Sequence, residues 1–176
     1  MKDELWKLGA CETATSIREG KLTCLEVVQA SADRLCQVNP GINAVTVNLT
    51  DEALISAKEA DAALLNGIKP GPLYGVPITL KENIDLAGKA TTLGVSSFID
   101  NIAPDDAPVV RSLKEAGAII IGQTNMPEFG LRWVTDNPLR GLTKNPWDSD
   151  RTPGGSSGGA AASIALGIGS IAHGND

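Results

Sequence analysis

Residues 151–166 read Arg-Thr-Pro-Gly-Gly-Ser-Ser-Gly-Gly-Ala-Ala-Ala-Ser-Ile-Ala-Leu, so a pair of serines stands between two pairs of glycines at the start of an apolar helix. Glycine lets backbone segments approach closely and adopts φ/ψ values that other residues resist. The start of a helix also offers unpaired N–H groups and the positive end of the helix dipole. Two hydroxyl groups at such a position suit chemistry on an oxygen atom that becomes negatively charged.

The same stretch has three other interpretations. Small residues before a helix often form only a cap and a tight turn. A phosphate-binding P-loop requires Gly-Lys-Ser/Thr, but Gly158 and Gly159 are followed by Ala160. Residues 154–158 match the G-x-S-x-G pattern of a nucleophile elbow, which directly follows a buried strand. Here the polar, proline-containing residues 148–153 precede the pattern. The pattern therefore matches, but the buried strand that should come before it is missing.

Two residues are candidates for the base that would activate a serine. His173 is the only histidine, and its place in an expected strand favours a role in the core or at the end of the sheet. Lys81 follows the apolar, β-branched run 73–80, and a buried lysine loses its proton more easily. Alone, such a lysine more often snorkels to solvent or pairs with a carboxylate such as Glu82 or Asp85. Together with the serine pair, Lys81 is the better candidate.

Several separate segments resemble the amidase signature family. They are Gly-Val-Pro-Ile-Thr-Leu-Lys-Glu-Asn-Ile-Asp at 75–85, residues 117–129, Asn-Pro-Trp at 145–147, and the glycine-framed serines at 151–159. The resemblance extends from about Leu73 to Asp176 with the motifs in the family's order. It implies an α/β fold with a mixed β-sheet wrapped by helices, of which this chain supplies only the first part. We therefore expect a single partial amidase domain over 1–176, with a helical region at 1–71 and the start of the signature core at 72–176.

The resemblance also implies a Ser–Ser–Lys triad. Lys81 matches the catalytic lysine, and Ser156 matches the bridging serine, which in the family follows a cis peptide bond, here Gly155–Ser156. We expect the Lys81 amine to point at the Ser156 hydroxyl. The nucleophile belongs to a motif resembling Asp-x-Gly-Gly-Ser, of which this sequence contains Gly-Asn-Asp at 174–176. The nucleophile and the oxyanion hole are therefore expected after Asp176, and these 176 residues alone are expected to be inactive.

The family's activity is hydrolysis of a carboxamide C–N bond through an acyl-enzyme. Gly130, Leu131 and Trp133 match a segment that lines the acyl pocket in family members, and Ser157 is assigned to substrate binding with them. Leu131 and Trp133 would make this pocket apolar, although either residue could belong to the core. The implied partner is a small-molecule amide, with a homo-oligomer possible, and no metal or cofactor is called for.

Other functions stay open at this point. Relatives include the catalytic subunit of a tRNA-dependent amidotransferase, but the ending at 172–176 departs from the commoner Leu-Gly-Thr/Ser-Asp and favours a stand-alone hydrolase. The chain could also be a non-catalytic binding domain derived from an amidase. A third alternative is an esterase that uses residues 154–158 with His173.

The composition of the chain argues against some classes of function but does not identify one. A net charge of −6 argues against non-specific binding of nucleic acid. No apolar stretch approaches 18 residues, so no contact with a membrane is expected, and the acidic start of the chain is unlike a signal peptide. Cys11, Cys24 and Cys36 are widely spaced and odd in number, which is typical of buried, reduced thiols in a cytoplasmic protein.

The pattern along the chain alternates between helices and strands. A capping box at Thr23-Cys-Leu-Glu26 predicts the start of a helix that ends at 39–41. Further helices are expected at 51–65, from a cap at Asp106 through Ala116, at 126–130 and at 157–166; strands are expected at 44–49, 76–81, 118–122 and 168–173; residues 91–103 and 136–153 are expected to be irregular. This alternation predicts an α/β fold.

Overall fold

The structure is a computed structural model and describes residues 2–176. Its elements, in chain order, are η1 (Lys2–Lys7), α1 (Ala10–Arg18), α2 (Cys24–Ile42), β1 (Val45–Asn48), α3 (Thr50–Leu65), β2 (Pro77–Lys81), η2 (Ser96–Phe98), α4 (Pro108–Glu115), β3 (Ile119–Thr124), η3 (Glu128–Gly130), α5 (Gly158–Ala165) and β4 (Ile171–Ala172), where η marks a 3-10 helix.

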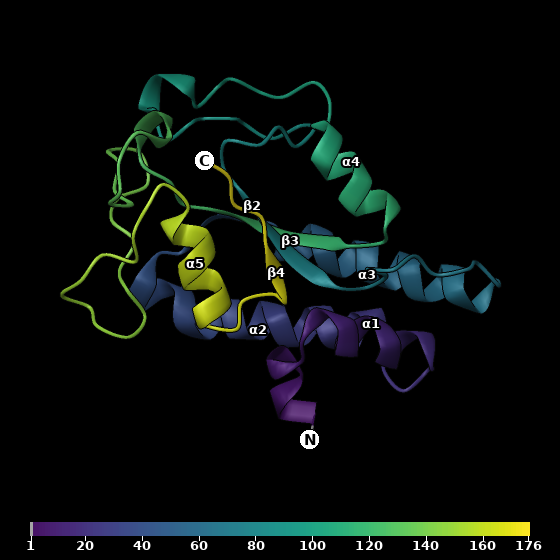
Figure 1. The fold of residues 1–176 in the computed structure, drawn as a ribbon. Helices are drawn as coiled ribbons and strands as arrows, with labels where there is room; N and C mark the ends of the chain where they lie inside the picture. Colours follow the sequence, from purple (N-terminus) through teal and green to yellow (C-terminus); the bar gives the residue numbers. More distant parts are fainter. Residues whose placement is uncertain (1) are drawn as a thin grey trace.

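The four strands form one mixed sheet in the order β1-β3-β2-β4. Strand β1 runs antiparallel to β3, whereas β2 is parallel to both β3 and β4. Figure 1 shows α1 and α2 below the sheet and α4 above it, with α5 beside β4. The predicted α/β fold with a mixed sheet among helices is confirmed.

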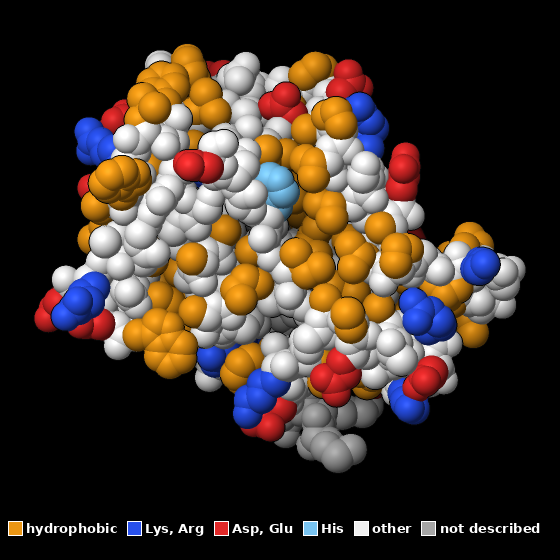
Figure 2. Space-filling view, in the orientation of Figure 1, with side chains coloured by type: hydrophobic (Ala, Val, Ile, Leu, Met, Phe, Trp, Pro, Cys, Tyr) orange, Lys and Arg blue, Asp and Glu red, His pale blue; other side chains and the backbone are white. Residues whose placement is uncertain are grey.

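Two clusters of buried side chains hold the helices to the sheet. In the first, Ile119 and Ile121 of β3 pack with residues of α2 and α3 that include Val28 and Ala57. In the second, Ile78 and Leu80 of β2 pack with residues that include Val110 of α4. Hydrophobic side chains also gather across the middle of the face drawn in Figure 2. Strand β2 is entirely buried and β3 is buried except for Ile120, whereas both residues of β4 are only partly buried.

The start of α2 follows the prediction, but its end does not. The Glu26 N–H donates to Thr23 Oγ1 at 3.0 Å and the Thr23 N–H donates to a Glu26 carboxylate oxygen at 3.1 Å, which confirms the capping box. The helix continues through Pro40 to Ile42 and is closed by Asn43 in the left-handed conformation. Pro40 has no N–H to donate within the helix, and the helix continues for only two residues beyond it.

The last strand is shorter than the sequence pattern predicts. Strand β4 contains only Ile171 and Ala172, because Gly167 and Gly169 have φ values of 73° and 74°, which are incompatible with extended backbone. The added Cβ of a larger residue at 169 would also lie 3.1 Å from the Pro77 carbonyl oxygen.

Three further predictions differ from the structure. Helix α4 begins at Pro108, and Asp106 does not cap it; the Asp106 carboxylate accepts the Ala87 N–H and the Lys114 ammonium instead. The predicted burial of all three cysteines is also wrong. All three are free, and only Cys24 is buried, because Cys11 and Cys36 lie on exposed positions of their helices. The short helix expected at 126–130 is reduced to one 3-10 turn at 128–130.

Candidate active site

Lys81 is the last residue of β2 and is almost completely buried, with 1% of its surface exposed. Every residue of this strand is buried, so the strand carries the amine into the interior of the fold. Lys81 Nζ lies 2.6 Å from Ser156 Oγ and donates to the Asn175 carbonyl oxygen at 3.0 Å. Burial lowers the pKa of Lys81, while the charge of Asp176 acts in the opposite direction. A lysine in this setting can serve as a base more readily than an exposed one.

The carboxylates that could have neutralised Lys81 are bound elsewhere. Glu82 forms a salt bridge with Arg140, with Arg140 Nη2 2.7 Å from Glu82 Oε1. Asp85 accepts the Thr91 hydroxyl at 2.6 Å. The simpler interpretation, in which Lys81 pairs with Glu82 or Asp85, is therefore not what the structure has.

Ser156 lies in a loop that packs tightly against a neighbouring segment. The Gly155–Ser156 peptide bond is cis, and Ser156 is buried. A Cβ added to Gly155 would lie 2.5 Å from the Arg132 carbonyl oxygen, which explains the glycine at this position. The buried Thr135 hydroxyl donates to the Gly154 carbonyl oxygen at 2.9 Å and accepts the N–H that begins α5. These contacts fix the serine loop at the start of α5.

The segment that contains Asn175 lies against this pair. Ser157 Oγ donates to the Asn175 carbonyl oxygen at 3.0 Å and lies 3.3 Å from the Asn175 nitrogen, which donates to it. Asn83 Nδ2 donates to Asn175 Oδ1 at 3.1 Å. Lys81, Ser156 and Ser157 are thus brought together, and Asn83 and Asn175 join them without having been predicted.

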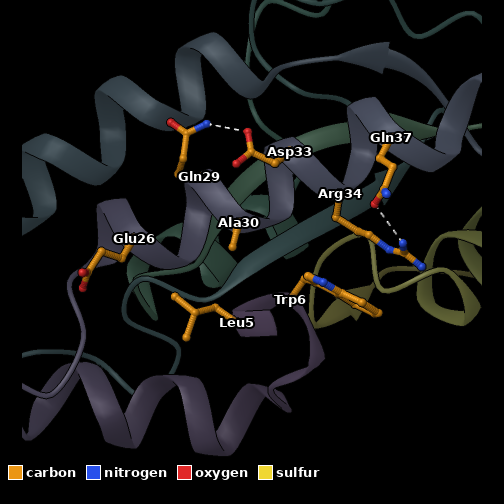
Figure 3. Close-up of a pocket in the computed structure, with 8 residues that line it drawn as sticks. All are labelled: Leu5, Trp6, Glu26, Gln29, Ala30, Asp33, Arg34 and Gln37. Carbon is orange, nitrogen blue, oxygen red and sulfur yellow. Dashed lines mark hydrogen bonds between the residues drawn. The ribbon is translucent and has the colours of Figure 1, made fainter. Parts of the chain in front are cut away.

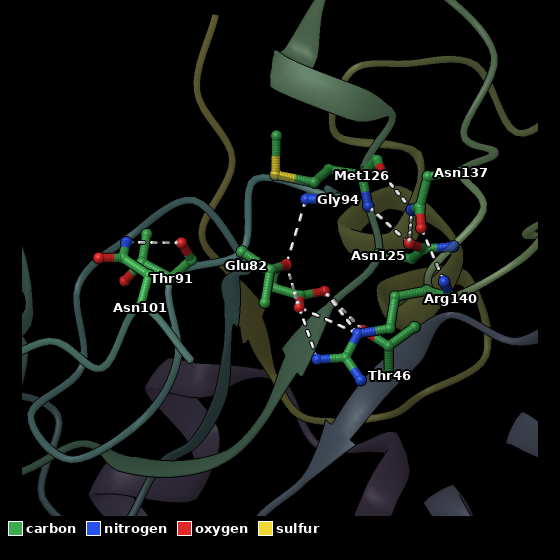
Figure 4. Close-up of polar contacts among 10 residues, drawn as sticks. Thr46, Glu82, Thr91, Gly94, Asn101, Asn125, Met126, Asn137 and Arg140 are labelled. Carbon is green, nitrogen blue, oxygen red and sulfur yellow. Dashed lines mark hydrogen bonds and ion pairs between the residues drawn. The ribbon is translucent and has the colours of Figure 1, made fainter. Parts of the chain in front are cut away.

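A buried polar network supports the Lys81 end of β2 (Figure 4). Glu82 is completely buried and accepts hydrogen bonds from Thr46 on β1, from Thr92 in the following loop, and from Arg140. Arg140 donates its main-chain N–H to Asn137, which in turn contacts Asn125 after the end of β3. The network joins β1, β2 and two long loops. Sequence reasoning missed Arg140 because its partner lies 58 residues away and no local pattern marks the pair.

The predicted substrate-binding residues occupy different environments. Gly130 adjoins Ser156, since its added Cβ would lie 3.6 Å from Ser156 Oγ. Leu131 and Trp133 are 82% and 88% exposed, so neither residue belongs to the core of the described structure.

His173 follows β4, and its main-chain N–H donates to the Thr79 carbonyl oxygen at 2.8 Å. Its Nδ1 atom is buried and has no hydrogen-bond partner in the described part of the structure. Burial lowers the pKa of His173, with a smaller contribution from Lys81. Ser156 is hydrogen-bonded to Lys81 rather than to this histidine, and no strand precedes the serine loop at 148–157. Both observations disfavour the esterase arrangement.

Other features of the described residues do not point to a second chemistry. A cavity of about 410 Å³ lies between η1 and α2, where the Arg34 guanidinium stacks 4.0 Å from the centre of the Trp6 ring (Figure 3). Neither Lys81 nor Ser156 lines it. Among the side chains that the structure describes, no group of three or more His, Cys, Asp or Glu is placed to hold a metal ion. Each helix within residues 2–176 is too short or too polar to span a membrane.

Comparison with known proteins identifies related chains. The family model described as "Amidase" matches residues 26–176. The indoleacetamide hydrolase of Bradyrhizobium diazoefficiens is 55% identical over 175 residues, which are 99% of this chain and 33% of that protein. A glutamyl-tRNA(Gln) amidotransferase subunit from Carboxydothermus hydrogenoformans is 42% identical over 173 residues, 98% of this chain and 36% of that protein.

Solved structures agree with these relatives. A structure of fatty acid amide hydrolase superimposes with a TM-score of 0.93 at 32% identity, covering 97% of this chain and 30% of that one. The chain thus spans about a third of the length of the relatives that it matches. Because the family model covers most of its residues and its fold is that of these enzymes, the chain belongs to the amidase signature family.

Proposed function

We propose that the protein is an amidase that hydrolyses a carboxamide C–N bond through an acyl-enzyme, with Lys81 and Ser156 as two members of a Ser–Ser–Lys triad. The observation that carries this proposal is the contact of 2.6 Å between Lys81 Nζ and Ser156 Oγ, both in buried residues. The names of relatives, which include an indoleacetamide hydrolase and an acylamidase, support an amide as substrate.

In this mechanism neutral Lys81 accepts the proton of Ser156, and Ser156 accepts the proton of the nucleophilic serine. The proposal places that serine in the motif that residues 174–176 resemble, beyond Asp176. Its oxygen bonds to the amide carbon and forms a tetrahedral oxyanion. The C–N bond then breaks, the proton returns through Ser156 to the leaving nitrogen, and an acyl-enzyme and an amine result. Water attacks the ester by the same relay, which releases the acid and restores the serine.

We further propose that the acyl group is apolar and aromatic. The support is the 55% identity to a protein named indoleacetamide hydrolase and the exposed apolar side chains of Leu131 and Trp133, in the chain segment that follows Gly130. Gly130 itself adjoins Ser156. A primary arylacetamide would then yield ammonia and an arylacetate.

Ammonia release from an arylacetamide by the full-length protein tests this function. We expect turnover without ATP or tRNA, loss of turnover in Ser156→Ala, and unchanged turnover in Ser112→Ala, which alters an exposed serine on α4. Turnover that requires glutamyl-tRNA and ATP would show an amidotransferase component instead. No turnover of any amide, with tight binding of the intact amide, would show a binding domain.

A further inference from the structure

Asn175 links three polar side chains at the candidate active site. Its carbonyl oxygen accepts hydrogen bonds from Lys81 Nζ and from Ser157 Oγ, both at 3.0 Å. Its side-chain oxygen accepts a hydrogen bond of 3.1 Å from Asn83 Nδ2. Asn83 lies two residues after Lys81, so the bond ties the end of β2 to the segment that follows β4. The side chain of Asn83 thus holds the residue whose carbonyl contacts the base.

The hydrogen bond to the Asn175 carbonyl oxygen affects where the lone pair of the Lys81 amine points. A neutral amine has two N–H groups and one lone pair, and rotation about the Cε–Nζ bond has three staggered positions. A carbonyl oxygen can accept only an N–H, so it removes the rotamer in which the lone pair points at Asn175. With one N–H on Asn175, the lone pair is free to face the Ser156 hydroxyl, 2.6 Å away. Proton transfer from Ser156 requires this orientation.

We propose that Asn83 is a positioning residue for the reaction: its amide fixes Asn175, and the Asn175 main-chain carbonyl orients the Lys81 amine toward Ser156. This inference rests on the proposed function, since it assigns Asn83 a part in the same proton relay. The Asn83 side chain donates a hydrogen bond to Asn175, so in this proposal Asn83 acts through Asn175. Its loss should therefore reduce the rate of the chemical step and leave substrate binding unchanged.

Two substitutions of Asn83 separate the effect of charge on the Lys81 pKa from the effect of the lost hydrogen bond to Asn175. The charge of Asp176 acts on Lys81, and the charge of Lys81 acts in turn on His173, while the neighbouring Glu82 is paired with Arg140. Asn83→Ala removes the amide and adds no charge. Asn83→Asp keeps the shape, removes the donor and adds a negative charge beside Lys81. A negative charge favours the protonated amine, so only Asn83→Asp should move the acidic limb of the pH profile to higher pH.

The test compares kcat, KM and unfolding midpoints of the full-length protein and its variants with an arylacetamide as substrate. We expect Asn83→Ala to lower kcat about tenfold to a hundredfold with KM within twofold, which is the usual cost of a misplaced reacting group. Asn175→Ala retains the main-chain carbonyl and loses the side-chain contact, so it should give the same loss. Because both substitutions remove the same hydrogen bond, between Asn83 and Asn175, the kcat of the double variant should be no lower than that of either single variant. Asn66→Ala, an exposed asparagine after α3, is the control.

Wild-type kcat in Asn83→Ala, or losses that multiply in the double variant, would overturn the inference. If Asn83→Ala fails to fold, Asn175→Ala carries the same expectation of lowered kcat with unchanged KM. Lys81→Ala separates the two proposals. If Lys81→Ala is inactive and Asn83→Ala is fully active, only the role of Asn83 is overturned. If Lys81→Ala is fully active, the proposed relay is overturned and the inference with it.

Discussion

Lys81 Nζ lies 2.6 Å from Ser156 Oγ, although 75 positions separate the two residues in the sequence. Lys81 lies at the end of a fully buried strand, and Ser156 lies in a tightly packed glycine loop at the start of α5. Neither segment alone defines a catalytic group. Their contact places a buried amine against a buried hydroxyl, which is the arrangement that a proton relay requires.

Replacement of Lys81 tests the assigned base. Lys81→Arg retains a positive charge, but a guanidinium stays protonated and cannot accept a proton. Both Lys81→Arg and Lys81→Ala should lower kcat/KM of the full-length protein by about a thousandfold or more. Lys58→Arg, at an exposed position of α3, should have no effect. Wild-type turnover in Lys81→Arg would remove Lys81 from the mechanism.

The buried carboxylate of Glu82 should matter for stability. Glu82→Ala leaves Arg140 without its partner and should lower the free energy of unfolding by about 3–5 kcal/mol. Urea unfolding of the full-length protein measures this change, with Glu59→Ala on the exposed face of α3 as the control. A loss no larger than that of the control would show that the network in Figure 4 contributes little to stability.

Close packing at Gly155 should make a single methyl group harmful. The Cβ of Gly155→Ala would lie 2.5 Å from the Arg132 carbonyl oxygen, so the serine loop must shift. We expect about 1–3 kcal/mol of destabilisation and a marked loss of kcat. Gly41→Ala is the matched control, because a Cβ there meets no atom within 4 Å and position 41 lies within α2. Equal behaviour of the two variants would contradict the packing described for this loop.

Trp133 should affect substrate binding and leave folding unchanged. Its side chain is 88% exposed, so Trp133→Ala should change the free energy of unfolding by no more than about 0.5 kcal/mol. Loss of an aromatic contact worth about 1.4 kcal/mol would raise KM for an arylacetamide about tenfold. Trp147→Ala removes a similarly exposed tryptophan, and its KM should stay at the wild-type value. Equal KM values for the two variants would exclude Trp133 from the acyl pocket.

Local patterns in the sequence predict much of this fold. The capping box at Thr23 and Glu26 fixes the start of α2, and the apolar run before Lys81 predicts a buried strand that ends in an amine. These features depend on neighbouring residues, so the sequence reveals them directly. The apolar pattern predicts a longer β4 than the structure has, because the pattern does not reveal the positive φ values of Gly167 and Gly169.

The supporting contacts of the site could not be predicted in this way. Arg140 reaches Glu82 over 58 residues and Asn83 reaches Asn175 over 92, and both pairs depend on how the loops pack. No periodicity or spacing marks such pairs. The division of the domain near residue 71, the cytoplasmic location and the formation of a homo-oligomer stay predictions.

Titration of Lys81 by NMR tests the central claim most directly. The full-length protein would carry lysines labelled with ¹³C and ¹⁵N in the side chain, with Lys81→Arg to assign the signal, and kcat/KM would be measured over the same pH range. Because the relay needs the neutral amine and burial lowers the pKa of Lys81, activity should fall as the pH drops through that pKa. The account predicts a Lys81 pKa below the ordinary lysine value of about 10.4 and an acidic limb of kcat/KM at the same pH. A pKa at or above the ordinary value, or an acidic limb unrelated to the Lys81 titration, would contradict it.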